Sequence, residues 1–113
     1  MTAVQSIFMV VAFVASIPAL ALEPDALYAK VSPSIVVIWA LDSKGGKAAQ
    51  GSGIVVSPGE VVTNCHVIKR AQSIVIEQNK RTVRARLRYR DAIRDLCQLN
   101  MEKAIGRPIT AIV

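Results

Sequence analysis

The chain has 113 residues, enough for one small domain, and 52% of them are apolar, a share that excludes an intrinsically disordered protein. It carries 14 Lys and Arg residues against 8 Asp and Glu, for a net charge of +6. This moderate excess favours loose contact with polyanions, but no aromatic pairs lie among the basic residues to stack on bases, so we expect no nucleic-acid partner.

Residues 1–21 have the pattern of a secretory signal peptide. They contain no charged side chain, and the run from Ile7 to Leu22 is apolar apart from one serine and one proline. The run is short for a membrane span, which needs about 20 residues, and it closes on Ala-Leu-Ala, as a cleavage site does. We predict a signal peptide, a mature chain over 22–113, no stable membrane insertion and a periplasmic or secreted location. An uncleaved anchor, or a first strand or core helix, is the alternative.

The mature chain is predicted to begin with a short helix over 24–31. Proline suits its first turn, and the Ser32-Pro33 pair ends it. Trp39, in the first strand after the helix, is expected in the core. Strands are predicted at 34–41, 50–57, 60–64, 73–77, 82–90 and 96–101, with a further one starting at Ile109. Short strands separated by turns predict an all-β barrel or sandwich.

The predicted strand at 82–90 has the clearest periodicity in the chain. Alternate residues place two sets of side chains on opposite faces. One face carries Val83, Ala85, Leu87 and Tyr89, and the other carries Arg84, Arg86, Arg88 and Arg90. We expect the arginines to form the solvated outer face of a barrel strand, where charge also discourages edge pairing. Binding of anionic lipid, glycan or a protein partner is the alternative.

Few residues offer chemistry. His66 is the only histidine, and Asp95 lies further on, directly before a predicted strand. Asp91 is interpreted as a turn residue. Cys65 and Cys97 are the two cysteines, and an even number in an exported protein favours one disulfide over two buried thiols. A zinc site lacks paired spacing and a fourth ligand, so we predict no metal and no cofactor.

Four short motifs follow one another along the mature chain, at 31–36, 51–56, 63–67 and 95–99. In order and spacing they resemble the first-strand entry, the glycine-rich strand, the histidine motif and the aspartate strand of trypsin-like serine proteases. The bacterial periplasmic high-temperature-requirement type is the most similar. The resemblance covers about residues 24–102. It implies the first six-stranded barrel of a chymotrypsin-like double barrel, incomplete, with a short N-terminal helix and without the second barrel.

The resemblance also implies roles for two residues. His66 would be the general base that takes the proton of a serine hydroxyl, and Asp95 would orient and stabilise its ring. If these two residues are in contact, Cys65 and Cys97 must also lie near each other. A disulfide between the cysteines would then clamp the pair.

The chain departs from the family in one respect. The family's nucleophile lies in a Gly-x-Ser-Gly motif of the second barrel, and the same loop supplies the oxyanion donors. After Asp95 the present sequence contains one hydroxyl, that of Thr110. Ser52 lacks the motif of a strained nucleophile turn and falls in a predicted strand. The chain is therefore expected to end before the nucleophile and to be inactive alone.

Two functions follow from these expectations. The first is a serine endopeptidase, with protein or peptide substrates once a second barrel completes it. The alternative is a secreted, non-catalytic, protease-like binding module. The retained His66 and Asp95 favour the enzyme, whereas the missing serine favours the module. We also expect an exposed apolar barrel face to cause self-association.

Overall fold

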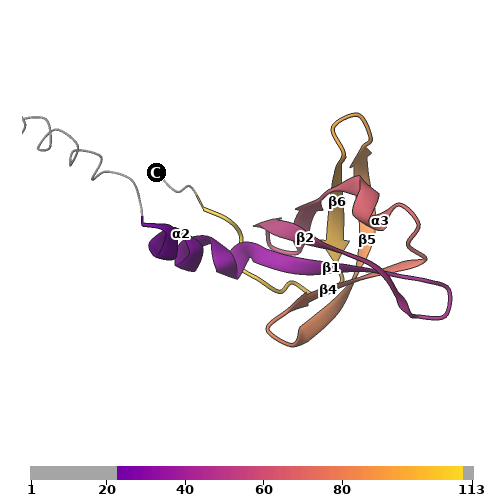
Figure 1. Cartoon of the computed structure of the whole chain (residues 1–113), viewed down its shortest axis with the longest axis horizontal. Helices are drawn as coiled ribbons and strands as arrows, with labels where there is room; N and C mark the ends of the chain where they lie inside the picture. Colours follow the sequence, from indigo (N-terminus) through magenta and orange to yellow (C-terminus); the bar gives the residue numbers. More distant parts are fainter. Residues whose placement is uncertain (1–22, 111–113) are drawn as a thin grey trace, which may run out of the picture.

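A computed structural model describes residues 23–110, which form a closed barrel of six strands (Figure 1). The strands are β1 (Ile35–Leu41), β2 (Lys47–Ser57), β3 (Glu60–Thr63), β4 (Ser73–Gln78), β5 (Arg81–Asp91) and β6 (Leu96–Met101). The helix α2 (Pro24–Val31) and the 3-10 turn η2 (Ser32–Ser34) precede the barrel, and α3 (Cys65–Ile68) joins β3 to β4. The predicted signal peptide lies outside the described residues. Between residues 23 and 110, no helix has the length and apolar character needed to cross a membrane.

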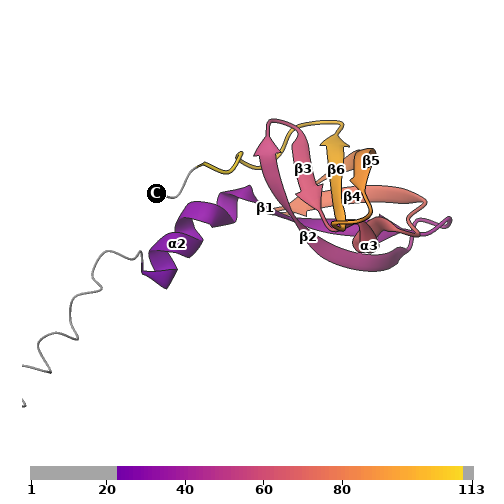
Figure 2. The same ribbon diagram turned by 90° about the horizontal axis from the view of Figure 1, so that it is seen from above.

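All neighbouring strands of the barrel are antiparallel. Their order is β1-β2-β3-β6-β5-β4, and β4 pairs back onto β1 to close it. Figure 2 shows β3 between β2 and β6, with α2 projecting away from the barrel. The predicted all-β barrel with a short N-terminal helix is therefore confirmed.

Alternating side chains fill the barrel. Along β1 every second residue from Val36 to Ala40 is buried, and β4 and β6 contribute in the same way. The fully buried side chains are Val36, Ile38, Val55, Val61, Ile76, Cys97 and Leu99. This core positions the end of β3 and the start of β6, which lie next to the candidate site.

Gly53 lets three strands approach one another closely inside the barrel. A Cβ at this position would lie 2.6 Å from Cγ1 of Val61 and 2.9 Å from Cδ1 of Ile38. Because both neighbours are core side chains, we expect Gly53→Ala to lower the free energy of unfolding by about 1–3 kcal/mol. Urea unfolding measures this, and the exposed neighbour offers a control in Ser52→Ala, expected within about 0.5 kcal/mol of wild type. Equal stability of Gly53→Ala and wild type would contradict this account of the packing.

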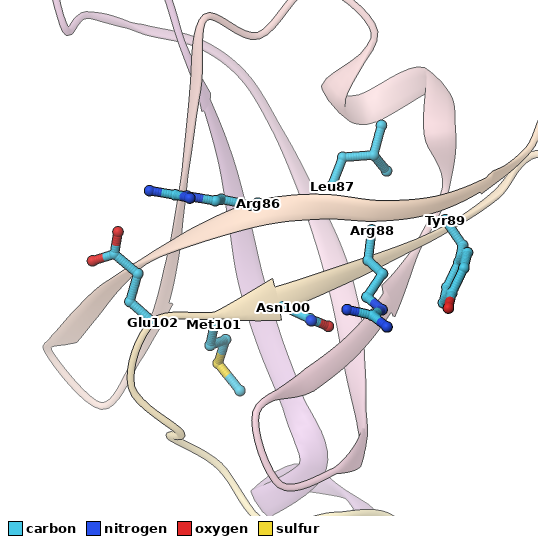
Figure 3. Close-up of a pocket in the computed structure, with 7 residues that line it drawn as sticks. All are labelled: Arg86, Leu87, Arg88, Tyr89, Asn100, Met101 and Glu102. Atoms are coloured by element: carbon cyan, nitrogen blue, oxygen red, sulfur yellow. The ribbon is translucent and has the colours of Figure 1, made fainter.

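The predicted alternation of β5 is interrupted by a bulge. Leu87 pairs with Leu99, but Tyr89 pairs with Gln98, so Arg88 is an extra residue on this strand. Figure 3 shows Arg88 and Tyr89 on one side of the ribbon and Leu87 on the other. The two faces of β5 therefore exchange at this point.

The bulge corrects the predicted arginine face. Arg84 and Arg86 are exposed, as expected, but Arg90 pairs with the buried Cys97 and so lies on the other face of the sheet. Tyr89, predicted to share the inner face, is 59% exposed. Period-two alternation holds only while the strand remains regular, and one inserted residue reverses it.

Trp39 is another correction, because it lies on the outer face of β1 and not in the core. Its Nε1 donates a hydrogen bond to Oε1 of Glu77 at 2.8 Å, and Nζ of Lys47 lies 4.0 Å from the ring centroid. The neighbours Ile38 and Ala40 take the inner positions. The outer environment also satisfies the indole N–H, which an apolar barrel interior would leave without a partner.

Several predicted bounds shift by a few residues. β2 begins at Lys47 because the preceding loop is tight: the Asp42 carboxylate accepts the backbone N–H groups of Lys44 and Gly46. The strand predicted from Ile109 onward is absent at residues 109 and 110, although the Ile109 N–H donates to the Val55 carbonyl. The remainder of that prediction lies outside the described residues.

Candidate active site

His66 is placed by the end of β3 and the start of α3. The hydroxyl of Thr63 donates to the Ser52 carbonyl at 2.7 Å, which ties the last residue of β3 to β2. Asn64 remains extended, and the helical turn of α3 begins immediately after it. Gly51 leaves room for this turn, since a Cβ there would lie 2.5 Å from Cγ2 of Val67. His66 therefore stands at the rim of the barrel.

Asp95 is placed by the turn between β5 and β6. The Asp91 carboxylate accepts the backbone N–H of Arg94 at 3.1 Å and its guanidinium at 2.7 Å. Asp91 is thus the turn residue that its position predicts. Asp95 itself has φ of +54°, in the left-handed region that Asp tolerates better than most residues. This conformation directs the chain back into β6.

The structure brings His66 and Asp95 together through two contacts. Nδ1 of the ring lies 2.5 Å from Oδ2, and the backbone N–H of His66 donates to Oδ1 at 2.9 Å. Both carboxylate oxygens are therefore engaged by the same residue. Within residues 23–110, no hydrogen bond is made to the other ring nitrogen, Nε2.

The backbone carbonyl of Asp95, like its carboxylate, accepts two hydrogen bonds. Its carbonyl accepts the Nδ2 amide of Asn64 at 3.0 Å and the backbone N–H of Cys65 at 3.3 Å. Asn64 is a site residue that sequence reasoning did not single out. Its position in the histidine motif, directly before Cys65, could have indicated this role.

A disulfide joins Cys65 to Cys97, with 5.0 Å between the Cα atoms. The pairing of β3 with β6 accounts for this distance, because Thr63 lies opposite Cys97 in that ladder. The predicted disulfide is confirmed. It connects the residue before His66 to the strand that follows Asp95, and therefore restrains the separation of the two side chains.

The contact with His66 lowers the pKa of the Asp95 carboxyl. The ring hydrogen bond is the main cause, and the ordinary value is 3.8. Since the folded-state pKa lies below the unfolded-state value, the contact stabilises the fold above pH 3.8. That stabilisation is lost as the pH falls through the folded-state pKa. The side chains are 70% and 41% exposed, so solvent weakens the pair.

The structure gives no support to Ser52 as a nucleophile or to a metal site among the described residues. Ser52 lies within β2, opposite Val37 of β1, and its described contact is the backbone carbonyl that accepts Thr63. No group of three His, Cys, Asp or Glu residues in the described part of the chain is arranged to hold a metal ion.

Two cations near His66 were not assigned to the site from the sequence. Lys69 and Arg90 line a hollow of about 210 Å³ together with His66 and Asp95. Lys69 lies three residues after His66, about one helical turn, and this spacing was the signal in the sequence that could have indicated it. The bulge in β5 directs Arg90 to this side, and no pattern in the sequence indicated that bulge.

Comparison with known proteins gives one family. Residues 51–112 match the trypsin-like peptidase domain. No curated protein matches the chain in sequence.

Solved structures of proteases share the fold, and two of them serve as examples. A serine endoprotease from Yersinia pestis has a TM-score of 0.70 and 27% identity, over 83% of this chain and 34% of that one. The active form of the Rv3671c protease from M. tuberculosis has a TM-score of 0.67 and 28% identity, over 85% of this chain and 42% of that one. The present chain thus spans less than half the length of either protease. The chain belongs to the trypsin-like peptidase family.

Proposed function

We propose that His66 and Asp95 form the base and its orienting partner in the active site of a serine endopeptidase. The supporting observation is the double contact, in which the ring and the backbone N–H of His66 both meet the Asp95 carboxylate. With its proton on Nδ1, the ring keeps a lone pair on Nε2. That nitrogen takes the proton of an attacking serine hydroxyl and then returns it to the leaving amine, while Asp95 stabilises the transient imidazolium.

The nucleophile and the oxyanion donors belong to a second barrel in this proposal. The two similar proteases are longer chains, of which the present one covers 34% and 42%. Its own sequence contains no Gly-x-Ser-Gly motif. The 113-residue chain alone is therefore inactive toward proteins and peptides, and gains activity when a second barrel supplies the serine.

Exposed apolar side chains near the site support a covering partner. Ile93, in the turn before Asp95, is 97% exposed, and Leu96, directly after Asp95, is 44% exposed. Large apolar side chains rarely remain uncovered in a group. The second barrel covers this surface in the complete enzyme, and self-association covers it when the chain is alone.

We also place the protein in the periplasm or outside the cell. The disulfide supports this location, because such bonds form and persist in oxidising compartments. The apolar residues 1–21 supply the export signal in this proposal.

The position of the ring proton tests the catalytic role. Nitrogen-15 NMR of the labelled chain, recorded at a pH where the ring signals are those of neutral imidazole, distinguishes the two tautomers. We expect His66 to carry its proton on Nδ1, facing Asp95, whereas a free imidazole prefers Nε2–H. In Asp95→Asn the carboxamide can donate to Nδ1, so the proton should move to Nε2.

Glu102→Gln is the matched control, since it removes an exposed carboxylate that has no described contact with His66. Its spectrum should retain the Nδ1–H tautomer. A wild-type ring protonated on Nε2, or an unchanged tautomer in Asp95→Asn, would refute the role proposed for Asp95.

A further inference from the structure

His66 stands between two hollows. The first, of about 210 Å³, is lined by Cys65, His66, Lys69, Arg90, Ala92 and Asp95. The second, of about 340 Å³, is lined by Ala40, Ala48, Ala49, His66, Val67, Lys69 and Arg70. The two residues common to both are His66 and Lys69. Lys69 therefore borders the space on both sides of the His66 ring.

The charges around these hollows are unbalanced. The two nearby carboxylates are engaged, because Asp95 contacts His66 and Asp91 contacts Arg94. Lys69, Arg70 and Arg90 are exposed, and in the described part of the chain none has a carboxylate within 4.0 Å. Three cations therefore face the solvent without a bound counter-charge.

We propose that Lys69 is a specificity-determining residue that selects an acidic side chain next to the scissile bond. The inference rests on the proposed function, since it takes the scissile bond to lie at His66. A glutamate or aspartate in either hollow meets the Lys69 ammonium, and in the first hollow it also meets the Arg90 guanidinium. A neutral side chain of the same shape gains neither interaction.

Lys69 is favoured over the two arginines by its position. It follows Ile68, the last residue of α3, and keeps helical backbone angles, so it lies on the same side of this turn as His66. Its contact with both hollows means that it acts whichever of them receives the acidic residue. Arg70 and Arg90 each line one hollow and strengthen the same preference.

NMR titration of the chain with two peptide probes tests the inference. The probes are N-acetylated, C-amidated pentapeptides of alanine with a central Glu or a central Gln. At low salt we expect the Glu peptide to shift the amide signals of Cys65–Ile68 and Asp95 at a several-fold lower concentration than the Gln peptide. Lys69→Gln should reduce this difference strongly, and Arg70 and Arg90 account for the remainder. Arg86→Gln, which removes a cation on the outer face of β5, should leave it intact.

Equal half-saturation by the two peptides, no shift with either, or an undiminished preference in Lys69→Gln would each overturn the inference. The ring tautomer of His66 is read from the same sample. A correct tautomer without discrimination contradicts the selectivity alone, whereas a wrong tautomer contradicts the proposed function whatever the peptides do.

Discussion

Fused to the second barrel of a related protease, the chain is expected to hydrolyse peptide amides, and His66→Ala is expected to reduce kcat by about 10⁶-fold. Asp95→Ala should cost about 10⁴-fold, since it leaves the base in place but removes its orientation and charge partner. The M. tuberculosis protease is a suitable source of the second barrel, because the present chain matches 42% of that protease's length. Hydrolysis of a peptide substrate and labelling by a fluorophosphonate probe measure the two effects.

Ser52→Ala is the control in this experiment, because Ser52 lies within β2 and is assigned no catalytic role. It should leave hydrolysis and labelling unchanged. The 113-residue chain without a second barrel should not be labelled. Labelling of that chain at Ser52, or a fusion that is equally active with and without His66, would contradict the assignment.

Removal of the disulfide is expected to lower the free energy of unfolding by about 3–4 kcal/mol. Without the link, the unfolded chain regains the entropy that closing a loop of this length removes. The two cysteines are separated by 32 positions. Small domains have about 5–15 kcal/mol in total, so the loss is a large share. Urea unfolding of the Cys65→Ala/Cys97→Ala variant, compared with wild type, measures it.

Reduction of the wild-type protein separates the covalent link from the packing of the sulfur atoms. Cys97 is 1% exposed, so its substitution also removes core contacts that reduction leaves in place. We expect reduction to account for most of the loss. Identical unfolding of oxidised and reduced protein would show that β3 and β6 need no covalent restraint.

The same link should matter for the site. Cys65 directly precedes His66, and its backbone N–H donates to the Asp95 carbonyl. Loss of the disulfide therefore frees the segment that holds the ring against the carboxylate. Stability and the geometry of His66 are coupled through a single pair of sulfur atoms.

Local patterns were sufficient for most of the architecture. Short strands separated by turn residues predicted an all-β barrel or sandwich, and the family resemblance implied the six-stranded barrel. The Ser32-Pro33 pair predicted the end of α2, where the structure places it. The order and spacing of the four motifs indicated the family, because both can be compared directly along the chain.

Other features depended on contacts between distant segments. The bulge at Arg88 arises from the pairing of β5 with β6, and it turned Arg90 toward the candidate site. Trp39 lies outside the barrel because Glu77, on the adjacent strand β4, accepts its N–H. No local pattern predicts such register, since it is set by the energy of both strands together.

The amino-acid order alone thus indicated the element types, the family resemblance and the candidate residues His66 and Asp95, because each depends on neighbours along the chain. The folded barrel decided that Lys69 and Arg90 lie beside the ring, that His66 meets Asp95 and that Cys65 meets Cys97. These contacts join residues 29 and 32 positions apart. They form only when the β3–β6 ladder closes the loop between them, which is a property of long-range pairing and not of local sequence.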